Sequence, residues 1–574
     1  MRHSFLTVFL LFALLSLPTR IGAQCHVSVG GELRQRILHN FDRLEQEKYR
    51  PQHVFLTEEQ SGYWPGDTEG RTILGLVLDA RSAGRQPLYL EEILCLLPSH
   101  LNAKGYLGTI HRGQADEQQL SGHGWLLRGL SEYYLWKHDA KALQLIKTIT
   151  DSLFLPIEPY LKSYPLDPDQ RTKNVGGASG NIVAAVGCWR LSTDIGCIFI
   201  GMDGFLQATQ ILDEAQIGGK AERHKMAKEW IELFLQCPLV KIEAQTHASL
   251  TGMRGLLRYA EMTGDDTYVK LAEQRWQAYK RYGMTEDYAN YNWFCRYNTW
   301  TEPCAVVDSY MVASQLWQAT HKAQYLTDAE LIYWNALCHG QRDNGGFGTD
   351  NCPGKASGTD CIGVAAYEAH WCCTMRGGEG LSRAAQYAAS ADADTLFLTT
   401  FRDMTVKAQL ASGALTITVN TLYPFQEKVS VDFFVKEAPR KAILAVPAFA
   451  WMTKLKVQVN GKPLSWKEDR GMVVFGNRFR GGDHIRLTFV MHPKDVGVVN
   501  PANNTPGSFR VGFGPLLLAT DSCQDNLLYG ERLIPLKGLT FRGEKSGAIV
   551  SPLYHLMSTR LTGKDYARRI LFHR

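Results

Sequence analysis

The sequence predicts an α + β multidomain protein, in which an (α/α)6 toroid is followed by a β-sandwich region. From about residue 30 to 390, apolar residues recur at spacings of three and four, the period of amphipathic helices. From about residue 395 onward, apolar and polar residues alternate, the period of strands with one buried face. The chain has 574 residues, more than one hydrophobic core usually holds, so at least two domains are expected.

The first 23 residues have the pattern of a secretory signal peptide. A basic residue near the start is followed by a largely apolar run over residues 5–17 and by small residues ending at Ala23. A lipid anchor on Cys25 is the alternative, but Gln24 stands where a small residue normally precedes a lipidated cysteine. No later run reaches the roughly 20 apolar residues of a membrane span. We therefore expect an exported protein, periplasmic or secreted, without a membrane span.

Residues 24–393 are expected to form the toroid. About a dozen amphipathic segments, such as "TILGLVLDARSA", "GWLLRGLSEYYLW" and "VKLAEQRWQAY", are joined by loops that alternate between short and long. This alternation is typical of a toroid, in which inner helices are surrounded by outer ones. A solenoid is less favoured because no repeat of fixed period is present.

Residues 394–574 are expected to form the β-sandwich region. Segments of strand length, such as "ALTITVNT", "KVSVDFFV" and "HIRLTFVM", follow one another, and the pair Asn460-Gly461 marks a turn. Successive short strands separated by turns predict packed antiparallel sheets. A helical toroid followed by a β-sandwich is common among carbohydrate-active enzymes, although a fold alone does not establish a function.

Charge and composition narrow the class of partner. The formal net charge is +5 and the basic residues are scattered, so nucleic acid is not an expected partner. The chain has 13 Trp, 24 Tyr and 24 Phe, and exposed rings of this kind stack well on sugar faces. Most of these rings are nevertheless expected to fill the core.

The cysteine content is unusual for an exported chain. Thirteen cysteines cannot all pair within one chain, so at least one thiol has another role. Cys352 and Cys361 bracket a short polar loop and are predicted to form a local disulfide. Other cysteines in apolar surroundings are expected to be small buried hydrophobic residues: Cys95, Cys188, Cys197, Cys237 and Cys338.

Four residues form a candidate metal site. Glu302 and Cys304 stand two positions apart at the start of a predicted helix, and Cys372 and Cys373 are adjacent. Three thiolates and a carboxylate suit tetrahedral Zn2+. A bound metal would also keep these thiols from random oxidation. The alternative is that Cys372 and Cys373 are inert buried thiols or members of disulfides.

A thiolate held by a metal is also a nucleophile. If Glu286, sixteen residues before Glu302, stands across the pocket, it could act first as general acid and then as general base. Together the two groups would make up the pair that a retaining glycosidase needs. The alternative is that Glu286 is a surface carboxylate in a loop.

These motifs resemble glycoside hydrolase family 127, the β-L-arabinofuranosidase family. The Glu-x-Cys motif, the upstream Glu286, the Cys-Cys pair and the strand motifs "LYPF", "VPAFAW" and "VNG" carry the resemblance, which runs over most of residues 70–520. The resemblance implies that Cys372 attacks the anomeric carbon to give a thioglycosyl intermediate, with Glu286 as acid/base. It also implies that His123 and His247 contact the sugar, with a structural role as the alternative for each. The implied ligands of Zn2+ are Glu302, Cys304, Cys372 and Cys373.

The chain departs from the family around these residues. Family members typically continue the cysteine pair with Pro residues and an Asn, whereas this chain reads "TMRGGE". A family histidine in the middle of the toroid has no clear counterpart in residues 176–188, "GGASGNIVAAVGC". These differences leave room for another sugar. Arg376 could bind the carboxylate of an acidic sugar; an internal salt bridge with Glu379 or Glu368 is the favoured alternative.

The sequence therefore predicts an exported, Zn2+-dependent retaining glycoside hydrolase. Its substrate would be a carbohydrate: a terminal β-L-arabinofuranosyl, or a related acidic or branched pentose-like residue, of plant cell-wall glycan. Two other functions remain open. An unsaturated uronyl hydrolase or lyase on the same toroid would need no adjacent cysteines. A non-catalytic glycan-binding protein would bind sugar without releasing it.

Overall fold

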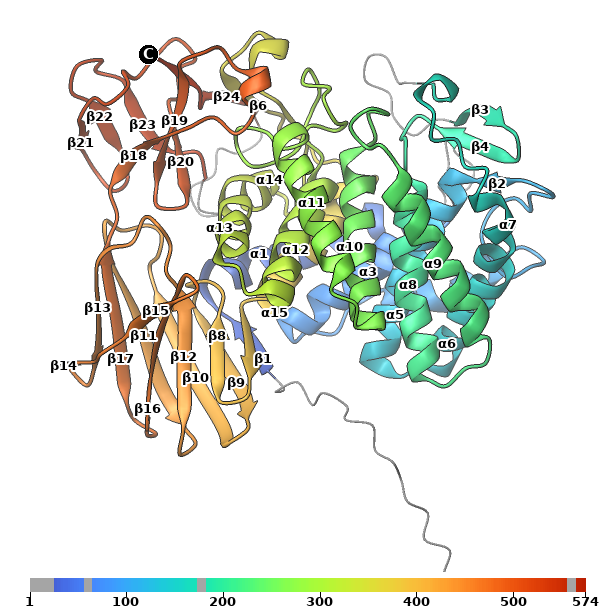
Figure 1. The fold of residues 1–574 in the computed structure, drawn as a ribbon, viewed down its shortest axis with the longest axis horizontal. Coiled ribbons are helices and arrows are strands. Elements are labelled where there is room, and N and C mark those ends of the chain that lie inside the picture. Colours follow the sequence, from blue (N-terminus) through green and yellow to red (C-terminus); the bar gives the residue numbers. More distant parts are fainter. Residues whose placement is uncertain (1–24, 56–63, 173–181, 555–563) are drawn as a thin grey trace, which may run out of the picture.

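The computed structural model describes residues 25–55, 64–172, 182–554 and 564–574. The predicted signal peptide lies outside the described residues. Residues 176–181, part of the segment that lacks a clear counterpart of the family histidine, also lie outside them. A helical part and a β part lie side by side, with a further sheet above the β-sandwich in the view of Figure 1. The predicted α + β architecture, with a helical toroid followed by a β-sandwich region, is confirmed.

Six helices of the described chain close into a ring. Each packs against the next, and the last packs against the first. In ring order they are α3 (Asp67–Ala83), α5 (Glu117–Lys137), α8 (Ile198–Glu214), α10 (Thr246–Thr263), α12 (Pro303–Thr320) and α15 (Cys373–Gln386).

A second set of helices packs outside the ring and alternates with it along the chain. These helices are α1 (Gly31–Leu44), α4 (Leu90–Leu96), α6 (Ala140–Ile149), α9 (Lys220–Gln236), α11 (Thr267–Tyr282) and α13 (Ala323–Ile332). Shorter helices are α2 (Pro51–Val54), α7 (Glu158–Leu161) and α14 (Cys338–Gly340). This alternation of outer and inner helices is the (α/α)6 toroid.

Burial separates the two sets of helices. Inner helix α3 is buried around nearly its whole circumference, whereas outer helix α11 buries one stripe formed by Ala272, Trp276 and Tyr279. The outer helices therefore have the amphipathic sequence pattern of a half-buried helix, whereas the inner helices are buried around more of their circumference.

Glycines allow the inner helices to approach closely. A Cβ atom on Gly70 of α3 would lie 2.2 Å from the backbone nitrogen of Leu126 in α5. A Cβ on Gly204 of α8 would lie 2.2 Å from the carbonyl oxygen of Gly124 in α5. Both positions therefore need a residue without a side chain.

Two sheets form the β-sandwich. The seven-stranded sheet has the order β1-β9-β10-β11-β17-β13-β14, and the five-stranded sheet has the order β15-β16-β12-β8-β7. Neighbouring strands are antiparallel, except that β8 and β12 are parallel. The strands are β1 (Cys25–Val29), β7 (Ala389–Asp392), β8 (Thr395–Leu398), β9 (Met404–Leu410), β10 (Gly413–Thr421), β11 (Lys428–Glu437), β12 (Ala442–Pro447), β13 (Thr453–Val459), β14 (Lys462–Pro463), β15 (Lys467–Asp469), β16 (Met472–Asn477) and β17 (His484–Val490).

The N-terminal strand was not predicted. β1 precedes the toroid in the sequence but pairs with β9 at the edge of the seven-stranded sheet. The partner residue of Cys25 is Ala408, 383 positions later in the chain. Local periodicity carries no information about such a distant partner.

The C-terminal residues form a third sheet and also return to the helical part. The sheet has the order β18-β19-β20-β23-β22-β21, and β25 pairs with β19. Its strands are β18 (Pro493–Val496), β19 (Ser508–Phe513), β20 (Leu516–Ala519), β21 (Leu533–Pro535), β22 (Phe541–Gly543), β23 (Ile549–Pro552) and β25 (Phe572–His573). Smaller sheets are β2-β4-β3 (Ala115–Asp116, Trp189–Ser192, Ile182–Val186) and β24-β6-β5 (Tyr566–Arg569, Cys361–Val364, Asp350–Asn351).

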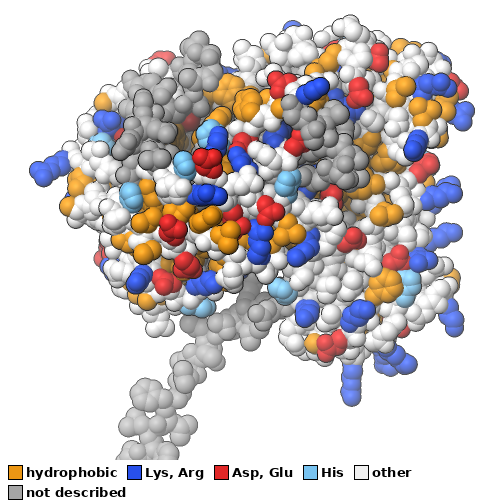
Figure 2. Space-filling view, turned by 180° about the vertical axis from the view of Figure 1, so that it is seen from behind, with side chains coloured by type: hydrophobic (Ala, Val, Ile, Leu, Met, Phe, Trp, Pro, Cys, Tyr) orange, Lys and Arg blue, Asp and Glu red, His pale blue; other side chains and the backbone are white. Residues whose placement is uncertain are grey.

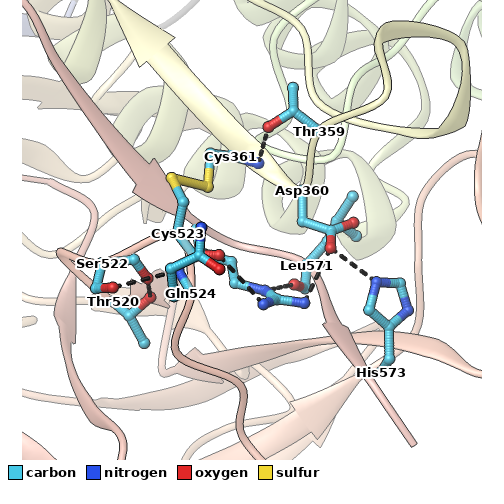
Figure 3. Close-up of a disulfide and its surroundings, with 10 residues drawn as sticks. Thr359, Asp360, Cys361, Thr520, Ser522, Cys523, Gln524, Leu571 and His573 are labelled. Carbon is cyan, nitrogen blue, oxygen red and sulfur yellow. Dashed lines mark hydrogen bonds and ion pairs between the residues drawn. A yellow bond between two sulfur atoms is a disulfide. The ribbon is translucent and has the colours of Figure 1, made fainter.

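The predicted disulfide between Cys352 and Cys361 is wrong. Cys361 is bonded to Cys523, 162 positions further along the chain, with a Cα–Cα distance of 6.0 Å (Figure 3). The cause is strand pairing, because β6 pairs with β24 and Cys361 is opposite Arg569. Cys352 remains a free buried thiol whose sulfur lies 3.8 Å from the carbonyl oxygen of Asn290.

The other predicted thiols are only partly as expected. Cys197, Cys237 and Cys338 are buried, Cys188 is half-buried, and Cys95 is exposed, which contradicts the expectation for Cys95. Cys95 lies near the end of the short outer helix α4, whose outer side faces solvent. Among the described residues, no helix is long and apolar enough to cross a membrane.

Candidate functional site

Three thiols meet where two inner helices begin. Cys304 is the second residue of α12, Cys372 is the N-cap of α15 and Cys373 is its first residue. The sulfur of Cys373 lies 3.8 Å from that of Cys304 and 3.4 Å from that of Cys372. Helix N-termini carry partial positive charge, so the ends of α12 and α15 favour thiolates here.

Glu302 and His247 extend this cluster. Glu302 is the N-cap of α12, and its Oε1 lies 3.2 Å from Nδ1 of His247 at the start of α10. Nε2 of His247 lies 3.3 Å from a carboxylate oxygen of Asp308. Candidate ligand atoms of His247, Glu302 and Cys304 lie within 4.8 Å of one another, as do the three sulfurs.

The donor set fits a tetrahedral metal ion. A Zn–S bond of about 2.3 Å places two sulfurs of a tetrahedral site about 3.8 Å apart, which is the separation of Cys304 and Cys373. Oε2 of Glu302 is buried and has no hydrogen-bond partner in the described part of the chain. A buried carboxylate oxygen without a donor is costly, and a metal ion would satisfy it.

Arg71 was missed by the sequence analysis. Its guanidinium donates to the sulfur of Cys304 at 3.3 Å and to Oδ2 of Asp67 at 2.8 Å. It also lies over the ring of Trp125, 4.3 Å from the ring centroid. A signal was present: Asp67 and Arg71 have the i,i+4 spacing of an ion pair, within a helix whose other residues are largely apolar.

Titration of the cluster points to one thiolate. Burial raises the pKa of Cys304, but hydrogen bonds from Cys372 and Cys373 and the charge of Arg71 outweigh it and hold this pKa well below its usual range. Hydrogen bonding with Cys304 raises the pKa of Cys372, and burial raises that of Cys373. Without a metal, the negative charge therefore resides on Cys304.

His247 is held in its charged form. Burial lowers its pKa, but the carboxylates of Glu302 and Asp308 raise it to about 9. The ring also stacks on Trp125, with 5.7 Å between ring centroids. His247 thus contacts the predicted metal ligand Glu302, and its predicted contact with the sugar stays a prediction.

Arg376 does not face a free pocket. It is fully buried, forms ion pairs with Asp308 (2.5 Å) and Glu379, and lies over the ring of Trp125. Burial lowers its pKa to about 9, against the opposing charge of Asp308. The internal salt bridge with Glu379 is therefore present, while Glu368 pairs with Arg43 instead. The guanidinium of Arg376 is paired with carboxylates inside the toroid and is not exposed to bind the carboxylate of an acidic sugar.

His123 is engaged in backbone contacts. Its Nε2 accepts from the N–H of Leu107 at 2.9 Å, and its Nδ1 donates to the carbonyl oxygen of Gln119 at 2.8 Å. The ring is fully buried, and burial lowers its pKa to about 4. These contacts give His123 a structural role, joining the 107 loop to α5.

Glu286 is buried among donors from the C-terminal part of the chain. Its carboxylate accepts from the backbone N–H groups of Val499 and Asn500, both at 2.8 Å, and from the side-chain amide of Asn504 at 2.7 Å. Nε of Arg510 lies 3.3 Å from Oε2. The alternative of a surface carboxylate is therefore wrong. The segment between β18 and β19 is anchored to the toroid through this residue.

Two exposed rings precede the cysteine pair in the sequence, by one and by five positions from Cys372, and they were not singled out. Trp371, immediately before Cys372, is 52% exposed, and Tyr367 is 56% exposed. Cys372 is the one half-buried thiol of the three, whereas Cys304 and Cys373 are buried. Cys372 is thus the least buried residue of the three, and it directly follows an exposed aromatic ring of a kind that can stack on a sugar.

Part of the chain matches the model of a known protein family. Residues 395–491 match the family model described as "Beta-L-arabinofuranosidase, GH127 middle domain". The match covers β8 to β17, which is most of the sandwich. No curated protein is similar to the chain in sequence.

Solved structures extend the likeness to the whole fold. A GH127 β-arabinofuranosidase, BT3674, is 14% identical with a TM-score of 0.69, covering 95% of this chain and 96% of its own. Ara127N-Se, a GH127 β-L-arabinofuranosidase from Geobacillus stearothermophilus T6, is 12% identical with a TM-score of 0.68, covering 96% and 100%. A further glycoside hydrolase is 13% identical with a TM-score of 0.67, covering 96% of both chains. The predicted resemblance to this family of glycoside hydrolases is confirmed, and the low identity makes the chain divergent.

Proposed function

We propose that this chain, a divergent relative of the GH127 β-L-arabinofuranosidases, is an exported retaining glycoside hydrolase that uses Cys372 as its nucleophile. Its substrate would be a terminal β-L-arabinofuranosyl or related pentose-like residue of a plant glycan. The observation that carries the proposal is the convergence of three thiols and Glu302 where two inner helices begin. Neither a structural core nor a simple binding surface requires such a set of groups.

Glu302, Cys304, Cys372 and Cys373 would hold Zn2+. Their spacing and the unpartnered oxygen of Glu302 support this assignment. When bound, the metal keeps the sulfurs deprotonated and lowers their tendency to oxidise. His247 would orient Glu302, since it contacts one oxygen and leaves the other free for the metal.

Accessibility supports Cys372 as the attacking group. It is the half-buried member of the cluster and stands beside exposed Trp371. Its sulfur would form a bond to the anomeric carbon while the bond from that carbon to the leaving oxygen breaks, and the leaving oxygen takes a proton from a general acid. Water would then displace the sulfur from the opposite face, so the two inversions give retention.

The acid/base role of Glu286 rests on the resemblance, and its contacts bear on how it could work. Two backbone N–H groups and the side-chain amide of Asn504 donate to its carboxylate, and the guanidinium of Arg510 lies beside it. To reach the leaving oxygen or the attacking water of a bound sugar, Glu286 would need the segment around Asn500 to shift.

Export is supported by one observation within the described residues. The disulfide between Cys361 and Cys523 joins distant parts of the chain, and such bonds persist mainly in oxidising compartments. In the same compartment, free Cys304, Cys372 and Cys373 would need protection, which a bound metal would supply.

The decisive experiment measures the products from a synthetic p-nitrophenyl β-L-arabinofuranoside. We expect Cys372→Ala to lose at least about a thousandfold in kcat/KM, while Cys338→Ala, a matched buried thiol outside the cluster, keeps wild-type turnover. Elemental analysis is expected to find about one Zn per chain. Full turnover by Cys372→Ala, or no release of arabinose by the wild-type protein, would refute the proposal.

A further inference from the structure

A groove lies on the β-sandwich, away from the thiol cluster. Its volume is about 1270 Å³, and it is formed where three connections meet, those between β11 and β12, β14 and β15, and β16 and β17. Half-buried Ile443 and Val474 contribute an apolar floor, and none of the residues that line it belongs to the site described above.

The rim of the groove is basic. Five cationic side chains line it and no acidic residue does. They are Arg440, Lys441, Lys467, Arg478 and Arg480. Figure 2 shows Lys and Arg side chains projecting along the edge of the molecule on the side where the sandwich lies.

Three of these charges lack an internal counter-ion. Both lysines are paired, with carboxylate distances of 3.3 Å to Asp394 and 3.5 Å to Asp469. Within the described residues, no carboxylate lies in ion-pair distance of the three arginines. Exposed guanidinium groups gathered without carboxylates are suited to bind a ligand that carries several carboxylates, because each can make two parallel hydrogen bonds.

An exposed aromatic ring stands among these charges. Trp466 lies in the connection between β14 and β15, lines the groove and is 40% exposed. An indole face packs well against the apolar face of a sugar ring. The combination of indole, guanidinium groups and an apolar floor therefore matches a carbohydrate that also bears negative charge.

We infer that this groove binds a segment of acidic polysaccharide whose sugars carry carboxylates. The volume exceeds the roughly 300–1,000 Å³ of typical small-ligand pockets, so several sugar units can be accommodated. Nucleic acid is disfavoured because the chain as a whole is nearly neutral, with +5 over 574 residues. This binding function goes beyond the proposed hydrolase and does not depend on it.

The test is affinity electrophoresis of the full chain in native gels containing polygalacturonate, with carboxyl-reduced polygalacturonate as the neutral reference. We expect retardation only by the acidic polymer. The triple variant Arg440→Ala, Arg478→Ala, Arg480→Ala is expected to bind at least about tenfold more weakly. Trp466→Ala is expected to weaken binding about fivefold or more, because it removes the stacking surface.

A matched control removes the same charge elsewhere on the sandwich. The variant Lys428→Ala, Lys454→Ala, Lys456→Ala alters three exposed lysines outside the groove and is expected to bind within about twofold of wild type. Equal loss in this control, equal retardation by the reduced polymer, or equal binding of single-stranded DNA would overturn the inference. Cys372→Ala should bind as wild type does, which separates this result from any failure of the hydrolase proposal.

Discussion

The guanidinium of Arg71 donates to the sulfur of Cys304 at 3.3 Å, although the two residues are 233 positions apart in the sequence. The same guanidinium pairs with Asp67 one helical turn before it. One positive charge on the first turns of α3 thus serves two buried negative groups. Removing it would take away the ion-pair partner of Asp67 and one of the two cations that act on Cys304, the other being His247.

Arg71→Met is therefore expected to destabilise the metal-free protein by about 3–5 kcal/mol, because an unpaired buried charge is costly. The double variant Arg71→Met, Asp67→Asn should recover part of this loss. Free energies of unfolding from urea denaturation, combined in a double-mutant cycle, test the coupling. A strictly additive double variant would contradict it.

Glu286→Gln separates the catalytic from the anchoring role of this residue. As the acid/base, Glu286 should matter most for poor leaving groups, so the variant is expected to lose about 10²–10⁴ in kcat/KM on alkyl arabinofuranosides and less on aryl ones. Azide should partly restore the rate, because a small anion can replace the base-activated water. Steady-state kinetics across a series of leaving groups measures this.

The matched control is Asn504→Ala, which removes one donor to Glu286 and keeps the carboxylate. We expect a loss of less than about tenfold, with no dependence on the leaving group. If both variants lose the same activity and the same thermal stability, Glu286 is an anchor and not an acid/base.

Asp79 is expected to make stability depend on pH. It is fully buried on α3, and burial raises its pKa to about 8, although Ser382 donates to it. Oδ2 of Asp79 and Oδ1 of Asn40 both lie near Gly378, and neither has a hydrogen-bond partner among the described residues. A proton on Asp79 would therefore supply a hydrogen-bond donor between two oxygens that otherwise only accept.

The folded state then keeps this proton while the unfolded chain, with a carboxyl pKa near 4, has lost it. Stability from Asp79 is complete below about pH 4 and falls as the pH rises to about 8. Asp79→Asn should remove this loss and stabilise the protein by a few kcal/mol at pH 8 relative to wild type. Urea midpoints at pH 5 and pH 8 test it, and an equal difference at both values would contradict it.

The disulfide is expected to stabilise the fold strongly. It closes a loop of 162 positions, and the loss of chain entropy in the unfolded state corresponds to about 5 kcal/mol. The double variant Cys361→Ser, Cys523→Ser should unfold at a lower urea concentration, and thiol reductant should have no further effect on it. Cys95→Ser, at an exposed free thiol, is the control and should match wild type.

Much of the fold follows from local patterns in the sequence. The change in period near residue 395 predicts where helices end and strands begin, because each element shows its own hydrophobic pattern. The pairing of β1 with β9, and of Cys361 with Cys523, depends on strand order in space. Such contacts leave no periodic signal in a single sequence.

Some residues of the candidate site could likewise be predicted from local sequence patterns, and others could not. Glu302, Cys304, Cys372 and Cys373 could be grouped because reactive residue types with unusual spacing stand at predicted helix starts. Arg71 was not singled out, because its one sequence signal, the i,i+4 spacing from Asp67, is also typical of ion pairs on exposed helix faces. The donors to Glu286 could not be predicted from the sequence either, since they belong to a segment more than 200 positions away.

The closed ring of α3, α5, α8, α10, α12 and α15 also bears on how such a protein can diverge. The reactive groups stand in the first turns of separate inner helices, whose close packing tolerates little change. The two GH127 structures nevertheless share only 12–14% identity with this chain while covering 95–96% of it. Most individual side chains can therefore differ while the ring and the sandwich keep their arrangement.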